Sequence, residues 1–497
     1  MALTVILPIL YLLGWFIFNV WFHPLRHFPG PLYLKATRLG FIYHQIKGTL
    51  PFDVLEWHKT YGDVVRIAPD ELSFITPPAL QDIQGHRAKG APDFEKPEAF
   101  YRPVDGMEID IISAGREEHS ILRRLLSHGF SDKSLRDQQP IIMSYIDLLM
   151  QRLHENCAGG NKALNIMSWY NFATFDIIGD LAFGESFGCL TNSDYHPWVS
   201  LIFRMARAGA MIQGLGHYPM VKNFLLSLVP KSMGEERDHH LELTRDKLMR
   251  RMKRHEDRPD LIEGMLKKKD ELGITMDQLQ ANSSILIIGG SETTATLLSG
   301  VTYFLLTNPQ ALLKVTQEVR ERFKSEGGIN FATVNDLSYM LGCHEALRLY
   351  PPVPAGLPRV TPRGGAEVCG QYIPDSGKSV HQWAVHHHEK LFKDPFEFHP
   401  ERFMGDERYT QDVREAFQPF HLGPRNCLGR NLAYVEMRTI LARLLFNFDI
   451  QIADDSRDWI KQKVFILLGE TAVECLLDTG IQVMIYCSFG QQPFPRA

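Results

Sequence analysis

Residues 420–429 read Phe420-His-Leu-Gly-Pro-Arg-Asn-Cys427-Leu-Gly429, and this stretch constrains the fold and chemistry of the chain most strongly. It places one cysteine on a glycine-flanked loop, shortly after Arg425 and directly before an apolar run typical of a helix. A free cysteine thiol titrates at about 8.5, and a helix N-terminus, a nearby cation or a metal lowers that pKa. The neighbours of Cys427 therefore favour a functional thiolate over a buried small hydrophobe.

Two glycines shape the backbone around this sulfur. Gly423 and Gly429 allow the chain to fold closely around Cys427, so that backbone N–H groups point at the sulfur. Such hydrogen bonds tune a metal-bound thiolate. Arg425 then has the right charge to meet an anionic group beside the metal.

The pattern Phe-x-x-Gly-x-Arg-x-Cys-x-Gly resembles the haem-binding signature of the cytochrome P-450 superfamily, with Phe420, Gly423, Arg425, Cys427 and Gly429 at its fixed positions. The resemblance implies that Cys427 is the axial thiolate of a haem b iron and that Arg425 contacts a haem propionate. A thiolate ligand pushes electron density into the iron and favours O–O cleavage. The implied fold is mainly α with a small β region, the cytochrome P-450 fold, in one large domain.

The longest predicted helix covers residues 276–307. Thr275 and Gln278 form a plausible capping box at its start. A helix of this length extends roughly 48 Å, which is enough to cross a whole domain. Its middle is apolar nearly all round, so we expect it to be buried.

Inside this helix lies the motif Gly289-Gly290-Ser-Glu292-Thr293. Glycines in the middle of a helix cost roughly 1 kcal/mol each relative to alanine, so another role should offset them. In the P-450 family this pattern forms an oxygen-binding groove. The resemblance implies that Thr293 hydrogen-bonds dioxygen, that Glu292 relays protons, and that Gly289 and Gly290 line the substrate site.

Glu345 and Arg348 lie on one face of a short predicted helix, and Arg402 follows downstream. An exposed pair at this spacing contributes only a few tenths of a kcal/mol and carries no functional information. The resemblance implies instead that all three residues form a buried network behind the haem. Such a network is a scaffold, because breaking a buried ion pair costs several kcal/mol.

Further cations match positions that contact the haem propionates in this family. His119 and Arg123 lie four residues apart on a predicted helix, with histidine in place of the more common tryptophan. Arg359 is the third candidate. Two carboxylates buried with a macrocycle need cations, and guanidinium suits them geometrically. The extended proline-rich segment before Arg359 is expected to line the substrate cavity through Val353, Ala355 and Leu357.

The N-terminal segment Leu3–Phe22 has no charged side chain and is long enough to span a bilayer. Basic residues follow it and none precede it, which places the body of the protein in the cytoplasm. We expect a single-pass signal anchor over residues 1–22, and a buried core helix or a cleaved signal is the alternative. The family resemblance implies the endoplasmic reticulum membrane. A proline-rich hinge at 23–33 and a catalytic domain at 34–466 follow.

Residues 467–497 do not resemble the terminal hairpin of the family, and we interpret them as an atypical tail from a retained intron or a frameshift. The rest of the composition is unremarkable for a large enzyme: 497 residues, 44% hydrophobic, with a formal net charge of -5. This charge argues against a nucleic-acid partner. Seven cysteines without a close pair argue against a zinc ribbon or a disulfide framework.

Two other motifs are weighed and set aside. Gly184-Glu-Ser186-Phe-Gly188 matches the nucleophile elbow of serine hydrolases, but a helical pattern precedes it where that motif requires a strand. The run 386–388 consists of three histidines, which cannot all converge on one metal ion from regular structure. We expect these histidines to lie on a surface loop.

The sequence as a whole resembles fungal secondary-metabolism members of the family, such as isotrichodermin hydroxylases, especially in residues 171–188 and 347–359. The implied function is insertion of one oxygen atom of O2 into a lipophilic terpenoid, polyketide or alkaloid. Electrons would come from NADPH through a membrane-bound NADPH–cytochrome reductase. A haem enzyme that rearranges or dehydrates its substrate without oxygen, and a non-catalytic haem-binding protein, remain as alternatives.

Overall fold

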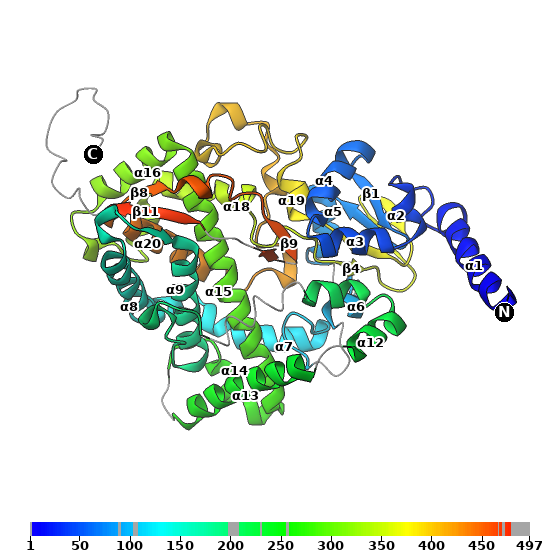
Figure 1. Cartoon of the computed structure of the whole chain (residues 1–497), viewed down its shortest axis with the longest axis horizontal. Helices are drawn as coiled ribbons and strands as arrows, with labels where there is room; N and C mark the ends of the chain where they lie inside the picture. The colour runs from blue at the N-terminus through cyan, green and yellow to red at the C-terminus, as the bar shows by residue number, and fades with distance from the viewer. Residues whose placement is uncertain are drawn as a thin grey trace.

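A single long helix, α15 (Met276–Thr307), crosses the helical half of the molecule, and the other helices of that half lie around it (Figure 1). Its capping box forms as the sequence predicts: the Thr275 hydroxyl accepts a hydrogen bond from the Gln278 N–H at 3.1 Å, and the Gln278 side chain accepts one from the Thr275 N–H at 3.2 Å. Most of its residues are buried. The predicted bounds of this core helix are therefore confirmed.

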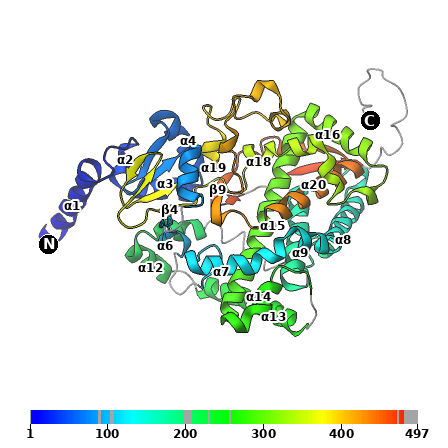
Figure 2. The ribbon, with the colours of Figure 1, turned by 180° about the vertical axis from the view of Figure 1, so that it is seen from behind.

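The structure, a computed structural model, describes residues 2–87, 91–102, 108–196, 208–228, 231–254, 258–465, 467–469 and 473–478. The helical half is built from α7 (Arg116–Ser127), α8 (Asp132–Asn156), α9 (Ile166–Phe183), α10 (Cys189–Asn192), α13 (Lys231–Lys253), α14 (Glu263–Leu272), α16 (Pro309–Arg322), α17 (Ser338–Gly342), α18 (Glu345–Leu349) and α20 (Arg430–Asn447). α12 (Pro219–Ser227) lies on the opposite side, toward the N-terminal helix (Figures 1 and 2). The arrangement is mostly helical with few strands, as predicted.

The smaller half contains the main sheet, whose strand order is β1-β2-β7-β4. Its strands are β1 (Val64–Ala68), β2 (Glu71–Phe74), β7 (Gly377–Ser379) and β4 (Arg359–Val360), with β5 (Ala366–Val368) and β6 (Gln371–Ile373) as a separate hairpin. The short helices on this side are α2 (Leu32–Ala36), α3 (Leu39–Lys47), α4 (Leu50–Tyr61), α5 (Pro77–Gln84), α6 (Glu98–Tyr101) and α19 (Gln382–His386). Only β2 and β7 pair in parallel in this sheet.

The C-terminal segment contributes strands to the fold. β9 (Lys463–Phe465) and β10 (Leu467–Gly469) form an antiparallel hairpin, so the boundary placed at residue 467 falls inside it. β11 (Glu474–Asp478) is the middle strand between β3 (Ala163–Asn165) and β8 (Asp449–Ile452). Cys475 is fully buried there. This part of the tail is integrated in the domain, whereas residues 479–497 lie outside the described residues.

The N-terminal helix projects away from the body of the molecule (Figures 1 and 2). α1 (Ala2–Ile17) continues into the π-helical turn η1 (Phe18–Phe22), and large side chains such as Leu7, Tyr11 and Trp21 are exposed. Among the described residues, the helix that is long and apolar enough to cross a membrane is α15, which is mostly buried, and the apolar helix Ile6–Phe22 is shorter. The hinge is also shorter than predicted, because α2 already begins at Leu32.

The three consecutive histidines lie in the interior, so their predicted position on a surface loop is wrong. The three side chains are at most 5% exposed. They are buried because α19, which ends at His386, packs within the hydrophobic core of the smaller half. Burial lowers the pKa of His386 to about 3, which keeps it neutral. Within the described residues, no cluster of three histidine, cysteine or acidic groups suited to a metal ion occurs. Ser186 follows helix α9, as the rejection of a nucleophile elbow requires.

One carboxyl group is buried at the packing interface of α15 and α20. Glu436 is 2% exposed and forms a hydrogen bond with Thr294, the residue after Thr293. Burial raises the pKa of Glu436 to about 8, and the hydrogen bond with Thr294 lowers it slightly. The carboxyl is therefore mostly neutral at pH 7, which avoids the high cost of an unpaired buried charge.

We expect the stability of the wild-type protein to depend on pH through Glu436. Its carboxyl titrates near 4.5 when exposed and at about 8 when folded. The stabilisation is thus complete below pH 4.5 and is lost as the pH rises to about 8. Relative to Glu436→Gln, the wild-type free energy of unfolding should fall by about 2 kcal/mol between pH 6 and pH 8. Thermal unfolding of both holoenzymes at several pH values checks this, and parallel curves would contradict it.

Candidate functional site

Cys427 lies on the loop between the 3-10 turn η9 (Gly423–Arg425) and α20. Its N–H donates to the carbonyl oxygen of Phe420 at 2.9 Å, which closes the loop beneath the sulfur. Gly423 has a φ of +74°, and a Cβ there would overlap the carbonyl oxygen of Gln84. The Gly429 N–H forms a hydrogen bond with the Cys427 sulfur. Gly423 therefore permits the tight loop, and the backbone of Gly429 directs a donor to the sulfur.

The sulfur of Cys427 faces an internal space. Its side chain is exposed, yet the surrounding protein desolvates the sulfur and raises the pKa of its thiol, so the sulfur lies in a recess and not on the outer surface. The Gly429 N–H and the positive charges of Arg123 and Arg430 act in the opposite direction and favour the thiolate. A metal ion bound to the sulfur would favour the thiolate further.

The middle of α15 presents an open face to the same region of the interior. Gly289 is exposed although it lies in a buried helix, and a Cβ added there would meet no atom within 4 Å. Ile285 and Thr293 each lie four residues from Gly289, and Ile288 lies three residues after Ile285. These half-buried side chains therefore share this face. α20, which follows Cys427 directly, packs against α15. The exposure of Gly289 and of Cys427 is what a flat ligand bound between the helix face and the cysteine loop would require.

Gly290 occupies a different position from the one expected. A Cβ on Gly290 would lie 2.6 Å from Cδ1 of Ile178 on α9, so the small residue permits close packing of α15 against α9. The expectation that Gly290 lines the substrate site is therefore wrong. The sequence pattern could not separate the two glycines, because the helix rotation that turns one inward and one toward α9 depends on tertiary packing.

The two residues with expected proton-handling roles lie on adjacent sides of α15. The Thr293 hydroxyl donates to the Gly289 carbonyl oxygen at 2.6 Å, and the helix continues through the motif. Glu292 is 7% exposed. Burial raises the pKa of Tyr195 to about 12, and the nearby Glu292 carboxylate contributes to the increase. Thr293 therefore shares the open face with Gly289, whereas Glu292 is buried near the half-buried Tyr195.

The predicted cations converge beside the cysteine loop. Arg123 donates to the Asn426 carbonyl oxygen at 2.7 Å, next to Cys427. Arg425 donates to the Ala114 carbonyl oxygen at 2.9 Å, and Arg359 donates to the Tyr101 hydroxyl at 2.5 Å. The structure thus gathers side chains that are separated by up to about 300 residues in the chain.

The lowered pKa values of two basic side chains show that these groups lie close enough together to repel one another. Burial lowers the pKa of His119 to about 3, with further lowering by Arg425, Lys96, Arg123 and Arg359. Burial also lowers the pKa of Lys96 to about 6, and Arg425 and Arg359 lower it further. Sequence reasoning missed Lys96, because no motif surrounds it and only the fold brings it to this cluster.

A ligand with two carboxylates would satisfy this arrangement. Like charges at low exposure are costly unless an anion lies among them. Arginine pairs well with carboxylates through parallel hydrogen bonds. A haem has a flat macrocycle for the open face at Gly289, an iron for the Cys427 thiolate and two propionates for the cations. The residues present therefore fit this cofactor.

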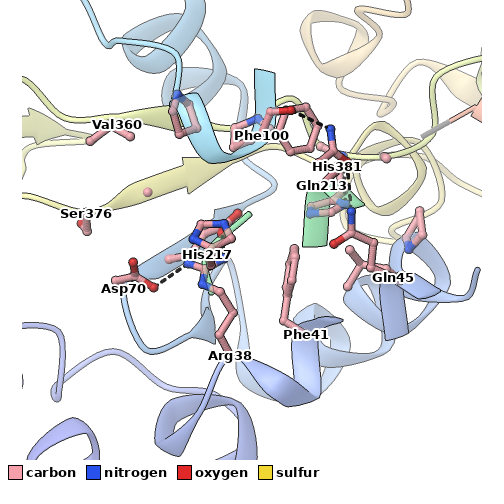
Figure 3. Close-up of a pocket in the computed structure, with 18 of the residues that line it drawn as sticks. Arg38, Phe41, Gln45, Asp70, Phe100, Gln213, His217, Val360, Ser376 and His381 are labelled. Atoms are coloured by element: carbon pink, nitrogen blue, oxygen red, sulfur yellow. Dashed lines mark hydrogen bonds and ion pairs between the residues drawn. The ribbon is translucent and has the colours of Figure 1, made fainter. Parts of the chain in front are cut away.

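The segment before Arg359 is extended, and its exposure alternates. Val353, Ala355 and Leu357 are half-buried, whereas the residues between them are buried. Successive side chains of an extended segment point to opposite sides, so these three share one side. Ala355 also lines a cavity of about 300 Å³ between α3, α6 and the main sheet (Figure 3).

Glu345, Arg348 and Arg402 form one buried network. Arg348 contacts the Glu345 carboxylate at 2.7 and 2.9 Å, and Arg402 contacts it at 3.0 Å. All three side chains are at most 1% exposed. Asp412, which the sequence did not indicate, pairs with Arg402 and makes the group electrically balanced. The network lies within the core and ties α18 to the segment that leads to the cysteine loop.

We expect Arg123→Met to weaken haem retention, with Arg124→Met as the matched control. Arg124 is the next residue on α7 and is exposed, whereas Arg123 is half-buried and contacts Asn426. A hydrogen bond to a charged group contributes roughly 1.5–3 kcal/mol, so haem transfer to apomyoglobin should accelerate on the order of tenfold in Arg123→Met. Equal transfer rates in the two variants would show that Arg123 does not hold the cofactor.

Comparison with known proteins gives a consistent result. Residues 30–474 match the model of the family described as Cytochrome P450. The chain is 48% identical over 449 residues to the cytochrome P450 monooxygenase tpeC of Talaromyces stipitatus, covering 89% of this chain and 88% of the relative. It is 41% identical over 457 residues to the trichothecene C-15 hydroxylase of Fusarium sporotrichioides, covering 91% and 92%.

Proposed function

This chain belongs to the cytochrome P450 family and is a haem monooxygenase that acts on a secondary metabolite; from this premise we propose how its own residues perform the reaction. The observation that carries the proposal is the position of the Cys427 loop beside a cluster of mutually repelling cations. One side of the site would hold the iron, and the other would hold the propionates.

Cys427 would bind the iron as a thiolate, with the Gly429 N–H donating to the sulfur. When bound, the haem supplies the iron that activates dioxygen for insertion of one oxygen atom into the substrate. Arg123, Arg359 and Arg425 would neutralise the propionates. The negative charge of the propionates near His119 would also raise the pKa of its imidazole from its low value.

The proton-handling roles fall to the open face of α15. The Thr293 hydroxyl, which donates to the Gly289 carbonyl oxygen at 2.6 Å, could turn to donate a hydrogen bond to a ligand on this face. Glu292, buried on the adjacent side, would hold a proton and pass it toward Thr293. Gly289 would leave the space between them free of side-chain atoms. These roles assign the exchange of protons to the protein rather than to bulk water.

The proposed substrate is a lipophilic small molecule of the terpenoid, polyketide or alkaloid class. The side formed by Val353, Ala355 and Leu357 is apolar and would contact it. One similar protein is named for hydroxylating a trichothecene, which supports a substrate of this kind. We further propose that electrons reach the haem from NADPH through a membrane-bound NADPH–cytochrome reductase.

Cys427→Ala provides the direct test. The wild-type ferrous carbon monoxide complex should absorb as a thiolate-ligated haem, and the variant should lose that band because the sulfur is absent. In the host organism, the same substitution should make the substrate accumulate, and metabolite profiling would identify it. Retention of the thiolate band in the variant would overturn the assignment. Turnover without oxygen and NADPH would favour the rearrangement alternative. A non-catalytic haem-binding protein would bind haem but consume no NADPH with any substrate.

We propose that α1 anchors the protein in the endoplasmic reticulum membrane with the catalytic domain in the cytoplasm. Its exposed apolar side chains support this position, because a contiguous exposed apolar surface marks a membrane or protein contact. In both views α12 lies on the side of the molecule from which α1 projects (Figures 1 and 2). It exposes Met220 and Phe224 by 88% and 63%, and Leu228, directly after the helix, is 63% exposed.

The membrane proposal predicts two separable contacts. A protein lacking residues 2–22 should still float partly with phospholipid vesicles, and Met220→Ser with Phe224→Ser should remove the residual binding, since the apolar contact of α12 is lost. Leu313→Ser on the distant α16 is the matched control, because Leu313 is 53% exposed. If the protein lacking residues 2–22 floats with the vesicles as completely as the full chain does, the role of α1 is contradicted.

A further inference from the structure

A stack of aromatic and basic side chains lies against the loop that carries Cys427. The rings of Phe420 and Tyr434 meet edge to face, with their centroids 5.0 Å apart and an interplanar angle of 64°. The His344 ring lies 4.5 Å from the Tyr434 ring, and the Arg438 guanidinium lies over the Tyr434 ring at 4.8 Å. We call Tyr434, His344 and Arg438 the Tyr434 clamp, because together they hold the ring of Phe420.

The Tyr434 clamp closes the neck of the cysteine loop. Phe420 precedes Cys427 by seven residues, and Tyr434 follows it by seven, on the second turn of α20. Their ring contact therefore joins the entry of the loop to the helix at its exit. The carbonyl oxygen of Phe420 also accepts the hydrogen bond from the Cys427 N–H at 2.9 Å. A change in the position of the Phe420 ring is thus transmitted to the backbone that carries the sulfur.

The outer end of the clamp is itself fixed. Arg438 lies four residues after Tyr434, on the same face of α20. Its Nη2 donates to Nε2 of His344 at 3.0 Å, and its Nη1 donates to the side-chain oxygen of Asn335 at 2.6 Å. Burial lowers the pKa of His344 to about 3, with further lowering by Arg438, so the imidazole is neutral and accepts this hydrogen bond. The guanidinium is therefore held over the ring in one orientation.

Tyr434 and Cys427 lie close enough to interact electrostatically. Burial raises the pKa of Tyr434, Arg438 and Arg430 lower it, and the charge of Cys427 raises it. The loop also directs the Gly429 N–H to the sulfur. The half-buried Tyr434 thus forms part of the low-dielectric surroundings of the sulfur, where hydrogen bonds and charges act more strongly than in water.

We propose that Tyr434 is a positioning residue for the Cys427 thiolate: its clamp holds the cysteine loop in the geometry in which backbone N–H groups donate to the sulfur, and it thereby raises the reduction potential of the iron bound there. The inference deepens the proposed function and rests on the haem site at Cys427. Hydrogen bonds to a ligating sulfur tune the potential of an iron centre. They favour the reduced iron, because reduction places more negative charge on the sulfur. The Arg438 charge acts in the same direction.

The size of the effect follows from the two contacts of the Tyr434 ring. An edge-to-face aromatic pair shifts an equilibrium roughly two- to tenfold, and a cation over an aromatic ring at a partly exposed site shifts it roughly two- to fivefold. Only part of this stabilisation differs between the oxidised and the reduced iron, so we expect about a threefold change in the reduction equilibrium. For a one-electron couple this is about 28 mV, since tenfold corresponds to about 59 mV.

The test measures the reduction potential of the full-length holoenzyme by spectroelectrochemical titration, together with the rate at which the ferrous carbon monoxide complex loses its thiolate band. Tyr434→Leu should lower the potential by about 28 mV and accelerate loss of the band about fivefold, because the iron releases the sulfur more easily once the loop is loose. Tyr434→Phe keeps the ring and should stay within about twofold of the wild type in both equilibria and rates.

A pair of arginine variants separates the stacked charge from a general change in surface charge. Arg438→Gln should lower the potential in the same direction as Tyr434→Leu but by a smaller amount, because the ring remains. Arg322→Gln is the matched control and should leave the potential unchanged. Arg322 also lies over an aromatic ring, that of Phe323 at 5.4 Å, and pairs with Asp336 at 2.8 Å at the end of α16.

The outcomes distinguish positioning of the thiolate from simple packing. An unchanged or higher potential in Tyr434→Leu and Arg438→Gln would overturn the proposal, even if both variants melt at a lower temperature. It would also be overturned if Tyr434→Phe were as defective as Tyr434→Leu. If Tyr434→Leu does not fold, Arg438→Gln gives the reading by itself. Absence of the thiolate band in the wild type would overturn the proposed haem site, whereas a normal band with unaltered variants would overturn this inference alone.

Discussion

Repulsion among buried cations is the constraint on which the interior of this protein depends. His119 and Lys96 both have a lowered pKa, first because they are buried and then because Arg425 and Arg359 lie close to them. The lowered pKa values keep His119 and Lys96 largely neutral near pH 7, and Asp93 offsets part of the repulsion at Arg425. The remaining guanidinium charges suit an anionic ligand, since desolvation and repulsion add. The proposed haem propionates supply the balance, and the cofactor thereby becomes part of the folding free energy as well as of the chemistry.

The Glu345 network provides a useful contrast, because its charges are balanced within the chain. Two guanidinium groups, Arg348 and Arg402, meet the carboxylates of Glu345 and Asp412, and carbonyl oxygens accept the remaining N–H groups. It needs no ligand and can form before cofactor binding. The protein therefore has one charged cluster that holds the fold and another that is completed from outside.

The two sides of the site differ in how they are held. The Cys427 loop is rigid, because Gly423 fits only as glycine and the loop continues directly into α20. By contrast, Gln213 is held by two neutral hydrogen bonds, to Gln45 and to the Phe100 carbonyl oxygen, and Gly216 lies against the Ala99 carbonyl oxygen.

The sequence by itself determined the local chemistry. The signature around Cys427, the capping box of α15 and the spacing of Glu345 and Arg348 are short-range patterns, and such patterns depend on backbone geometry that a few neighbouring residues set. Tertiary packing decided the rest. It turned Gly290 toward α9 instead of the site, and it brought Lys96 into the cation cluster. It also buried the histidines after α19 and joined Gln45 to Gln213 across 168 residues. These outcomes depend on which helix faces meet, and no local pattern carries that information.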